Sequence, residues 1–399
     1  MIRRIQIDNF KPLDGFSLPP AGTPPLANFT CLIGANGSGK TSVLQFLDFL
    51  CYFMRGEVGV WLKDRGWEED VLSSSFDSSP WGLFNTSISI QLDPSTQADW
   101  SVHYNQYGGV PDEESIVVEG RTLLQARDGD VRIEESIGGS KVFPGLSLRG
   151  SALEAIQVAP APNPLGVIKE LFSKNLVTFE LFSSESAKRQ SPRSNNIGRH
   201  GENLAGFTAD LERDIQTRIS DRMRKFYPSI QNVYLDQDLI SKLYRNNAKE
   251  NLLREAVPSS QFSDGFTRTL AIVTQIESST ASTRVLLIDQ IEDGIHPELM
   301  AKLIDYLVNS KVQVIATTHS PMILNYLSDE QARESLLFLY RNSEGRTHSC
   351  RYFDLPSTKK KLGILGPGEI YIDTSVEQLA REAEEMERGA SAQAGAPAQ

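Results

Sequence analysis

One eight-residue segment restricts the possible folds more than any other part of the sequence. It reads Gly34-Ala35-Asn36-Gly37-Ser38-Gly39-Lys40-Thr41, a full match to the phosphate-binding pattern G-x-x-x-x-G-K-[ST]. A strand-like run from Phe29 to Ile33 precedes it, and apolar residues at three- and four-residue steps from Val43 to Phe53 predict a buried helix after it. Such a unit points backbone N–H groups and the start of a helix at phosphate oxygens.

The residues of this loop have distinct expected roles. Lys40 would bridge the β- and γ-phosphates of a nucleotide, and the Thr41 hydroxyl would bind Mg²⁺. ATP and Mg²⁺ are therefore the expected substrate and cofactor. Further nucleotide contacts are expected from Gly34, Asn36, Gly37, Ser38, Gly39 and Ser42.

A second stretch, LLIDQIEDGIHPEL at residues 286–299, supplies a candidate metal carboxylate. Its apolar run ends in Asp289, which places that carboxylate at the carboxyl edge of a sheet, beside the phosphate loop. We expect Asp289 to hold Mg²⁺ together with Thr41. The residue that follows is Gln290.

The order of elements predicts an α/β fold with a mostly parallel sheet, because strands and helices alternate. Short alternating runs between Ser87 and Glu135 add an antiparallel β meander, and a hairpin with the turn NSEG is expected from Leu336 to Phe353. A helix is predicted around Val167 to Phe182, and residues 184–198 are expected to form a flexible connector. The other predicted elements are a first strand at 2–7, a helical stretch at 201–227, strands at 285–288 and 312–316, and helices at 297–308, after Pro321 and at 376–388.

These patterns give a first division of the chain into domains. Residues 1–85 and 200–372 are expected to form the core. Residues 86–199 would contain the β meander and an inserted helical lobe. Residues 373–388 would form a C-terminal helix, and 389–399 a disordered tail.

Composition excludes several classes of protein. No apolar run approaches the roughly 20 residues of a membrane helix, so a cytoplasmic protein is expected. The net charge of −11, from 51 acidic and 40 basic residues, restricts any DNA contact to local patches. The three cysteines show no spacing typical of a zinc site or a disulfide framework. Candidate basic patches are Lys188, Arg189, Arg193 and Arg199; Arg222, Arg224 and Lys225; and Lys359 to Lys361, each of which can equally be a solvated face.

Five further segments carry a resemblance to a known family. They are IDNFKPLDGF (7–16), GENLAGF (201–207), FSDGFTRTLAI (262–272), IEDGIHPE (291–298) and ATTHSPMIL (316–324). With the phosphate loop and Asp289, they resemble the ABC-type ATPase heads of the overcoming-lysogenization-defect (OLD) and RecF-like group, also called AAA15/AAA21. The resemblance implies an ABC-type head with an antiparallel meander and an inserted helical lobe.

The resemblance also implies a dimer that encloses two ATP molecules. In such a dimer Ser263, Asp264 and Gly265 would act in trans as the signature that meets the partner's γ-phosphate. Read from the sequence alone, Ser-Asp-Gly can equally be a helix N-cap. The segment from Glu292 to Pro297 would cross the dimer seam, and His319 would sense the γ-phosphate. The family's glutamine-loop residue is not identified, with Gln91 as the only suggestion.

The resemblance gives Gln290 a specific meaning, because the family has a general-base glutamate at this position. A glutamine can still hydrogen-bond the attacking water, but its amide cannot accept a proton. Hydrolysis should therefore be slower by about 10²- to 10⁴-fold while ATP binding persists. Two explanations stay open: an alteration of an active parent sequence, which we favour, or a naturally slow switch.

Three functions follow as hypotheses. Many relatives carry a C-terminal TOPRIM nuclease domain, whereas the residues after about 355 predict at most a strand and a helix. We therefore expect a homodimeric or higher even-numbered ATPase that regulates a separately encoded effector, as ATPase subunits of bacterial anti-phage defence do. The alternatives are a RecF-like DNA repair ATPase and an ATP-dependent scaffold that does not hydrolyse ATP.

Overall fold

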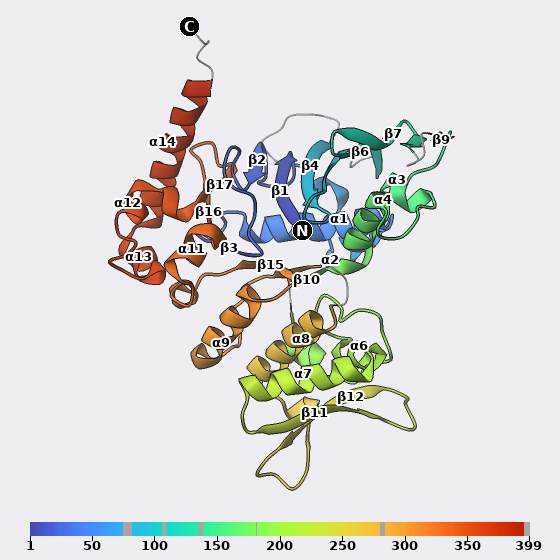
Figure 1. Ribbon diagram of the computed structural model, residues 1–399, viewed down its shortest axis with the longest axis vertical. Coiled ribbons are helices and arrows are strands. Elements are labelled where there is room, and N and C mark those ends of the chain that lie inside the picture. The colour runs from blue at the N-terminus through green and yellow to red at the C-terminus, as the bar shows by residue number, and fades with distance from the viewer. Residues whose placement is uncertain (75–81, 106–108, 135–138, 181, 280–283, 395–399) are drawn as a thin grey trace.

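The phosphate loop follows one strand of a six-stranded sheet (Figure 1). The structure is a computed structural model that describes residues 1–74, 82–105, 109–134, 139–180, 182–279 and 284–394. The strand order is β10-β14-β15-β3-β16-β17, and every bonded pair is parallel except β16 with β17. The predicted mostly parallel α/β sheet is thus confirmed. Its strands are β10 (Leu176–Phe179), β14 (Val285–Ile288), β15 (Gln313–Thr317), β3 (Phe29–Ile33), β16 (Leu336–Arg341) and β17 (Thr347–Arg351).

Neighbouring residues of these strands enter two separate hydrophobic cores. In β14, Leu287 packs in the core that contains α1 (Lys40–Met54), whereas Ile288 packs in the core that contains α8 (Asp264–Glu277) and α9 (Pro297–Val308). A parallel sheet covered on both faces needs apolar residues on both. This is why the strands appear in the sequence as continuous apolar runs.

An eight-stranded antiparallel sheet forms a second layer, in the order β2-β1-β4-β5-β6-β7-β8-β9. The predicted meander is confirmed, and the opening strand β1 joins it by pairing with β4. The strands are β1 (Ile2–Asp8), β2 (Phe16–Leu18), β4 (Leu83–Gln91), β5 (Gln97–Asn105), β6 (Val110–Val118), β7 (Arg121–Arg127), β8 (Asp130–Glu134) and β9 (Ser140–Phe143).

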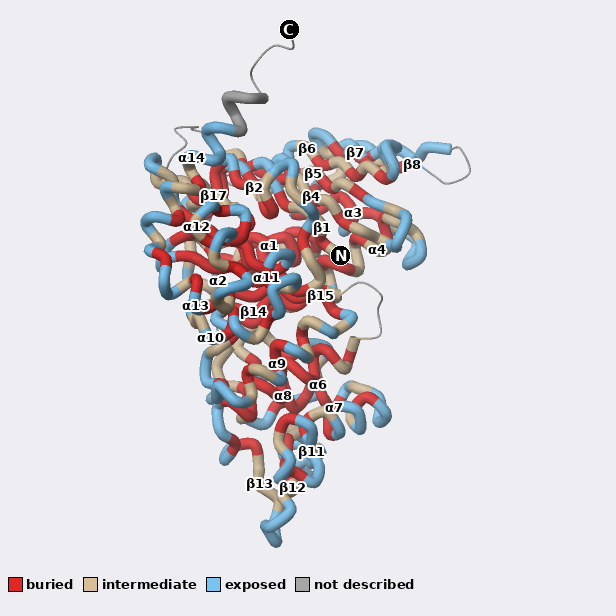
Figure 2. Tube along the Cα trace, turned by 60° about the vertical axis from the view of Figure 1, so that its left-hand side comes forward, coloured by how far each residue is buried: buried red, intermediate tan, exposed pale blue. Residues whose placement is uncertain are grey.

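Helix α1 lies between the two large sheets and is buried along most of its length (Figure 2). Its Phe49 ring packs 5.5 Å from the Tyr104 ring of β5, and its Phe53 ring 6.2 Å from the Trp100 ring. Aromatic pairs at such distances add to the stabilisation from burial. The helix that follows the phosphate loop is therefore held from both sides.

A helical lobe separates β10 from β14 in the sequence and extends away from both large sheets (Figure 1). The predicted division placed the helical lobe within residues 86–199, whereas the helices that stand apart are α6, α7 and α8. The reason is that apolar periodicity predicts a helix but not the layer against which it packs. The division into domains stays a prediction. The lobe comprises α6 (Leu204–Asp210), α7 (Arg213–Phe226), β11 (Ile230–Gln237), β12 (Tyr244–Glu250), β13 (Val257–Pro258) and α8.

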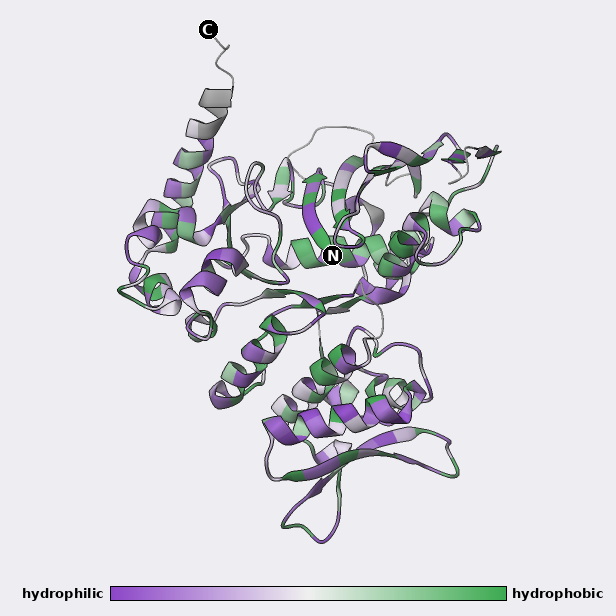
Figure 3. Ribbon diagram, in the orientation of Figure 1, coloured by the Kyte–Doolittle hydropathy of each residue, from purple (hydrophilic) through white to green (hydrophobic). Residues whose placement is uncertain are grey.

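Polarity distinguishes the lobe from the core (Figure 3). Helix α1 is mostly hydrophobic, whereas α7 is mostly hydrophilic and buries only a stripe that includes Ile215, Ile219 and Met223. The steps of four residues between these positions place them on one face of the helix. Helix α7 thus covers the lobe's core with one face and meets solvent with the other.

The predicted helix from Val167 to Phe182 is wrong in its second half. Helix α4 (Pro164–Glu170) continues as a π-helical turn to Asn175, and β10 then begins at Leu176. A short apolar run such as LVTF fits a buried strand as well as a helix. In the structure it forms a strand, because it pairs with β14. The expected connector at 184–198 begins with a short helix, α5 (Ser184–Ala187).

The predicted hairpin from Leu336 to Phe353 is confirmed by β16 and β17. The C-terminal helix α14 (Val376–Ala394) is longer than predicted and includes the start of the expected disordered tail. The remainder of that tail, 395–399, lies outside the described residues. No helix in the described part of the chain is both long and apolar enough to cross a membrane.

Candidate functional site

The carboxyl edge of the parallel sheet brings together three hydroxyl and carboxyl side chains. The Thr41 hydroxyl lies 3.2 and 3.1 Å from the two carboxylate oxygens of Asp289, and the Thr317 hydroxyl donates to Asp289 at 2.6 Å. Burial raises the pKa of Asp289, and these two hydroxyl hydrogen bonds oppose the rise. The oxygens suit Mg²⁺, which takes one or two carboxylates and completes its ligands with phosphates and water.

The described residues contain no group of three or more His, Cys, Asp or Glu side chains that could hold a metal ion. A metal at this edge would therefore depend on Thr41, Asp289 and the phosphates of the nucleotide. The donor set fits Mg²⁺ bound with a nucleotide and does not form an all-protein cage.

Lys40 lies within the curl of the phosphate loop. Its ammonium donates to the carbonyl oxygens of Gly34 and Ala35 at 3.0 and 2.8 Å. Burial lowers the pKa of Lys40 to about 8, and the negative charge of Asp289 opposes that shift. No residue with a side chain fits in place of Gly34, because a Cβ would lie 2.1 Å from the carbonyl oxygen of Leu339. The loop is therefore packed closely against β16 at Gly34.

Gln290 combines a fixed backbone with an exposed side chain. It lies in the left-handed region with φ of 48°, which is uncommon for a residue other than glycine. Its N–H donates to the Thr317 hydroxyl at 2.8 Å, so Thr317 holds Asp289 and Gln290 together. The side chain is solvent-exposed at the edge where Asp289 and Thr41 meet.

A buried arginine that sequence reasoning missed connects this turn to the helical lobe. The guanidinium of Arg268, on α8, donates to the carbonyl oxygens of Asp289 and Gln290 at 2.8 and 2.9 Å. Burial lowers the pKa of Arg268, and Asp293 opposes the shift. The only hint in the sequence is an arginine in an otherwise apolar helix face, which does not reveal its partners.

The segment after Gln290 holds the loop that carries His319. Glu292 accepts hydrogen bonds from the Thr318 hydroxyl and the His319 N–H, both at 2.8 Å. The His319 side chain is exposed, and partial burial together with Lys40 lowers its pKa. The lowered pKa favours the neutral imidazole, and its exposure makes it accessible to a ligand.

The three predicted signature residues lie at the start of α8. The Ser263 hydroxyl accepts from the Phe266 N–H at 3.2 Å as an N-cap, and Asp264 pairs with Lys188 at 2.7 Å. Gly265 is buried, and a Cβ on it would lie 2.6 Å from the carbonyl oxygen of Gly294. Ser263 and Asp264 are exposed, so they are accessible to a partner. Within one chain the motif acts as a helix cap.

Glu180 is a second acidic residue at this edge that sequence reasoning missed. It follows β10, the strand next to β14, and it contacts Arg65 at 2.5 Å and Gln45 at 2.5 Å. Glu180 is near enough to Asp289 to raise its pKa. Gln91 lies elsewhere, at the end of β4, where its amide bonds to the carbonyls of Asp93 and Thr96.

Half of the candidate basic residues are paired with acidic side chains of the chain. Five of the ten form ion pairs, which leaves less unpaired positive charge than the sequence suggests, and Arg199 donates to a backbone carbonyl. The pairs are Lys188 with Asp264, Arg193 with Asp210, Arg199 with the carbonyl of Asp64, Arg222 with Glu277, Arg224 with Asp221 and Lys361 with Asp373.

Comparison with known proteins gives two family matches. Residues 1–93 match the family described as "AAA ATPase domain", AAA_15, and residues 164–325 match AAA_21, "AAA domain, putative AbiEii toxin, Type IV TA system". No curated protein matches the sequence.

Two solved structures are similar to this fold. One is an Smc head bound to the C-winged helix domain of ScpA, with a TM-score of 0.55 and 14% identity over 87% of this chain and 97% of that one. The other is an Smc head with an extended coiled coil bound to the C-terminal domain of ScpA derived from Pyrococcus furiosus, with a TM-score of 0.50 and 12% identity over 87% and 95%. At such identities the likeness shows the fold alone.

The fold is that of ABC-type ATPase heads. The sequence carries an AAA_15 region at the N-terminus and an AAA_21 region that contains Asp289, Gln290 and the signature residues. The fold and both matches support an ATPase.

Proposed function

We propose that this chain binds ATP with Mg²⁺ at the phosphate loop and hydrolyses it slowly because of Gln290. The observation that carries the proposal is the cluster of Thr41, Asp289 and Thr317 beside the curled loop that contains Lys40. Bound Mg²⁺ would neutralise charge on the phosphates. Lys40 would exchange its two carbonyl partners for phosphate oxygens, and Asp289 would orient the Thr41 hydroxyl.

The backbone around Gln290 supports the assignment of this position to the attacking water. Arg268 and Thr317 hold the backbone of Gln290, and its side chain is exposed beside Asp289. A glutamate with the same backbone would present a carboxylate in the same place. The amide of Gln290 can align a water molecule but cannot take its proton.

We further propose that two heads enclose ATP and that the ATP-bound dimer regulates a separate effector protein. The exposed Ser263 and Asp264 support a contact with the partner's nucleotide. The AAA_21 description names a "putative AbiEii toxin" of a type IV toxin–antitoxin system, which supports a link to a toxin system. A role in anti-phage defence is the form of this link that we propose. The bound ScpA domains on the Smc heads support a partner protein. We propose that the protein performs this role in the cytoplasm.

Phosphate release by this chain and by Gln290→Glu tests the proposal. We expect the glutamate form to be faster by about 10²- to 10⁴-fold, with ATP affinity changed little. Gln290→Ala, which also lacks a base, is the matched control and should stay slow. Equal rates for the glutamine and glutamate forms would show that residue 290 is not the base.

Measurement of the mass of the assembly with and without ATP tests the scaffold hypothesis. A Gln290→Glu form that assembles with ATP but still fails to hydrolyse it would favour a scaffold.

A DNA-binding assay with and without ATP tests the DNA repair hypothesis. ATP-dependent binding that weakens steeply with salt would favour a DNA repair ATPase. The ion pairs within the candidate basic patches speak against a DNA repair ATPase.

A further inference from the structure

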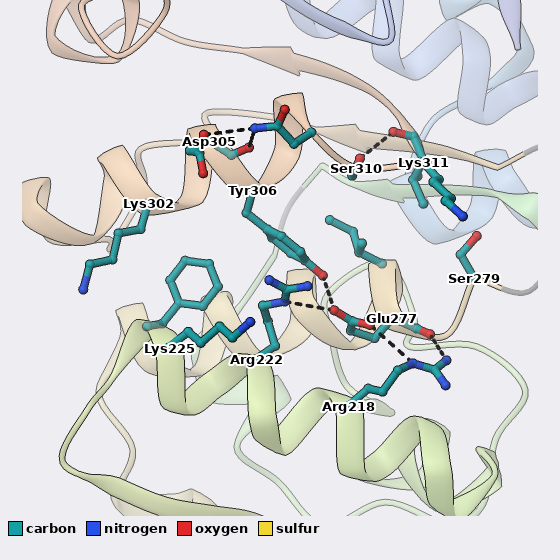
Figure 4. Close-up of a pocket in the computed structure, with 14 residues that line it drawn as sticks. Arg218, Arg222, Lys225, Glu277, Ser279, Lys302, Asp305, Tyr306, Ser310 and Lys311 are labelled. Carbon is teal, nitrogen blue, oxygen red and sulfur yellow. Dashed lines mark hydrogen bonds and ion pairs between the residues drawn. The ribbon is translucent and has the colours of Figure 1, made fainter.

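A cavity of about 610 Å³ lies near the amino end of β15, and Figure 4 shows the residues that line it. Its walls come from α7, the end of α8, α9 and the residues that lead into β15. Val312, which lines it, directly precedes β15, whereas Asp289 and Thr317 lie at the carboxyl ends of β14 and β15. The cavity is therefore separate from the nucleotide site.

One wall is an ion-pair cluster that serves the fold. Glu277 accepts from Arg222 at 3.0 Å, lies 3.5 Å from Arg218, and accepts from the Tyr306 hydroxyl at 2.9 Å. The Arg222 guanidinium also lies 4.4 Å from the centre of the Tyr306 ring. These contacts join α7, α8 and α9, and they account for both arginines of the cavity (Figure 4).

Among the described residues, three lysines of the cavity lack the acidic partners that the two arginines have. Lys225 comes from α7, Lys302 from α9 and Lys311 from the loop before β15. No ion pair or hydrogen bond joins their ammonium groups to any residue in the part of the chain that the structure describes. Three unpaired cations thus line one cavity of a chain whose net charge is −11.

The favourable interaction of a cation with a helix C-terminus applies to only two of the three lysines. Lys225 lies in the last turn of α7 and Lys311 just beyond the end of α9, where cations stabilise helix C-termini. Lys302 lies in the middle of α9, beyond the reach of that effect, which falls off within the last turn. Lys302 lines the same cavity as Lys225 and Lys311, but it lies at the opposite end of the view from Lys311, with Asp305 between them (Figure 4).

We propose that this cavity binds a phosphate-bearing ligand. Lysine ammonium groups bind phosphate as compact point charges. The apolar residues that line the cavity, Phe226, Ile276 and Val312, are only 3 to 8% exposed, so a ligand would contact mainly the cavity's charged and polar groups. The volume lies within the range of small-molecule sites, roughly 300 to 1,000 Å³. The phosphate can belong to a free phosphorylated molecule or to a nucleic-acid strand.

Calorimetric titration with two probes tests the site in the full chain. Inorganic tripolyphosphate represents a free ligand, and a 5′-phosphorylated single-stranded oligonucleotide represents nucleic acid. Lys40→Ala removes the contribution of the phosphate loop. In that background we expect one remaining site, weakened about tenfold or more by Lys302→Glu and by Lys311→Glu.

The control is Lys63→Glu, which makes the same charge change at an exposed position on α2 (Val58–Arg65), outside the cavity. It should leave the remaining site unchanged. Binding of tripolyphosphate identifies a free phosphorylated ligand, and binding of the oligonucleotide alone identifies nucleic acid. Loss of all binding in Lys40→Ala, equal weakening by Lys63→Glu and Lys302→Glu, or no binding of either probe would overturn the proposal.

Discussion

The Arg268 guanidinium donates a hydrogen bond of 2.9 Å to the backbone carbonyl of Gln290. Arg268 belongs to α8, whose first turn contains the proposed signature, and Gln290 follows the strand that ends in Asp289. A side chain of the helical lobe therefore sets the backbone of the residue that we assign to the attacking water. The lobe and the nucleotide edge are joined at the point where hydrolysis would occur.

Replacement of Arg268 by methionine should destabilise the chain. The change removes the Arg268 donor from the carbonyl of Asp289 and one of two donors from the carbonyl of Gln290, which still accepts from the Asp293 N–H at 3.0 Å. We expect a loss of about 2 to 4 kcal/mol in the free energy of unfolding. Urea unfolding measures it. Arg333→Met, at an exposed position of α11 (Asp329–Ser335), should stay within about 0.5 kcal/mol. In the Gln290→Glu background, Arg268→Met should also slow phosphate release, and an unchanged rate would show that Arg268 serves the fold alone.

Asp289→Asn should separate stability from nucleotide binding. Burial raises the pKa of Asp289, so the charged carboxylate costs stability when no metal is bound, and asparagine should raise the melting temperature of the nucleotide-free chain. The same change should weaken Mg²⁺-dependent ATP binding by about 10- to 100-fold, because Asp289 orients the Thr41 hydroxyl. Calorimetry and thermal unfolding give the two readouts. Unchanged ATP affinity would rule out the assigned role.

Arg65→Met should lower the free energy of unfolding, because Arg65 is the cation of a buried cluster that includes Glu180. Arg65 contacts Glu180 at 2.5 Å and Asp48 at 2.8 Å, and its side chain is only 3% exposed. Removal of the cation leaves two buried carboxylates without a counter-ion, at a cost of about 3 to 5 kcal/mol, although Trp61 still donates to Asp48 and Gln45 still donates to Glu180. The double variant Arg65→Met/Glu180→Gln should recover part of this loss in urea unfolding. If the two changes are additive instead, the ion pair contributes no coupling energy.

Glu114→Gln should give a pH-dependent loss of stability in the antiparallel sheet. The buried carboxylate accepts from Trp100 and Ser151 through one oxygen and from the Ala152 N–H through the other, and a glutamine amide would face that N–H with a second donor. We expect a cost of about 1 to 3 kcal/mol.

The pH dependence follows from the pKa of Glu114, which burial raises above the usual 4.5. As the pH rises above 4.5, the folded chain retains a proton that the unfolded chain has lost. The difference in the free energy of unfolding between the wild type and Glu114→Gln should therefore shrink from pH 4.5 up to the raised pKa. Urea unfolding of both forms across this range measures the difference. A constant difference would mean that the pKa of Glu114 is not raised.

Local patterns in the sequence were sufficient for the phosphate loop and its neighbours. Gly34 to Thr41 form one continuous motif, and the end of an apolar run placed Asp289 at the correct sheet edge. Each depends on residues next to one another in the chain, or on the rule that parallel strands end at the same edge.

Arg268 and Glu180 could not be found in this way. The Arg268 contact with Gln290 depends on how α8 packs against the turn after β14, and no spacing in the sequence encodes that. Glu180 follows a strand that apolar periodicity assigned to a helix, so its place beside β14 was hidden. The proposed signature was visible as a motif, but its role as an N-cap within the chain needed the structure.

The contact of Gly265 with the Gly294 carbonyl has a consequence for a dimer with shared sites. The two backbones lie against each other with no room for a methyl group, so we expect the start of α8 and the loop after Asp289 to be displaced together. In such a dimer, the loop after Asp289 would face the chain's own nucleotide and the start of α8 the partner's nucleotide. Binding or hydrolysis at one nucleotide would then affect the contacts made with the second.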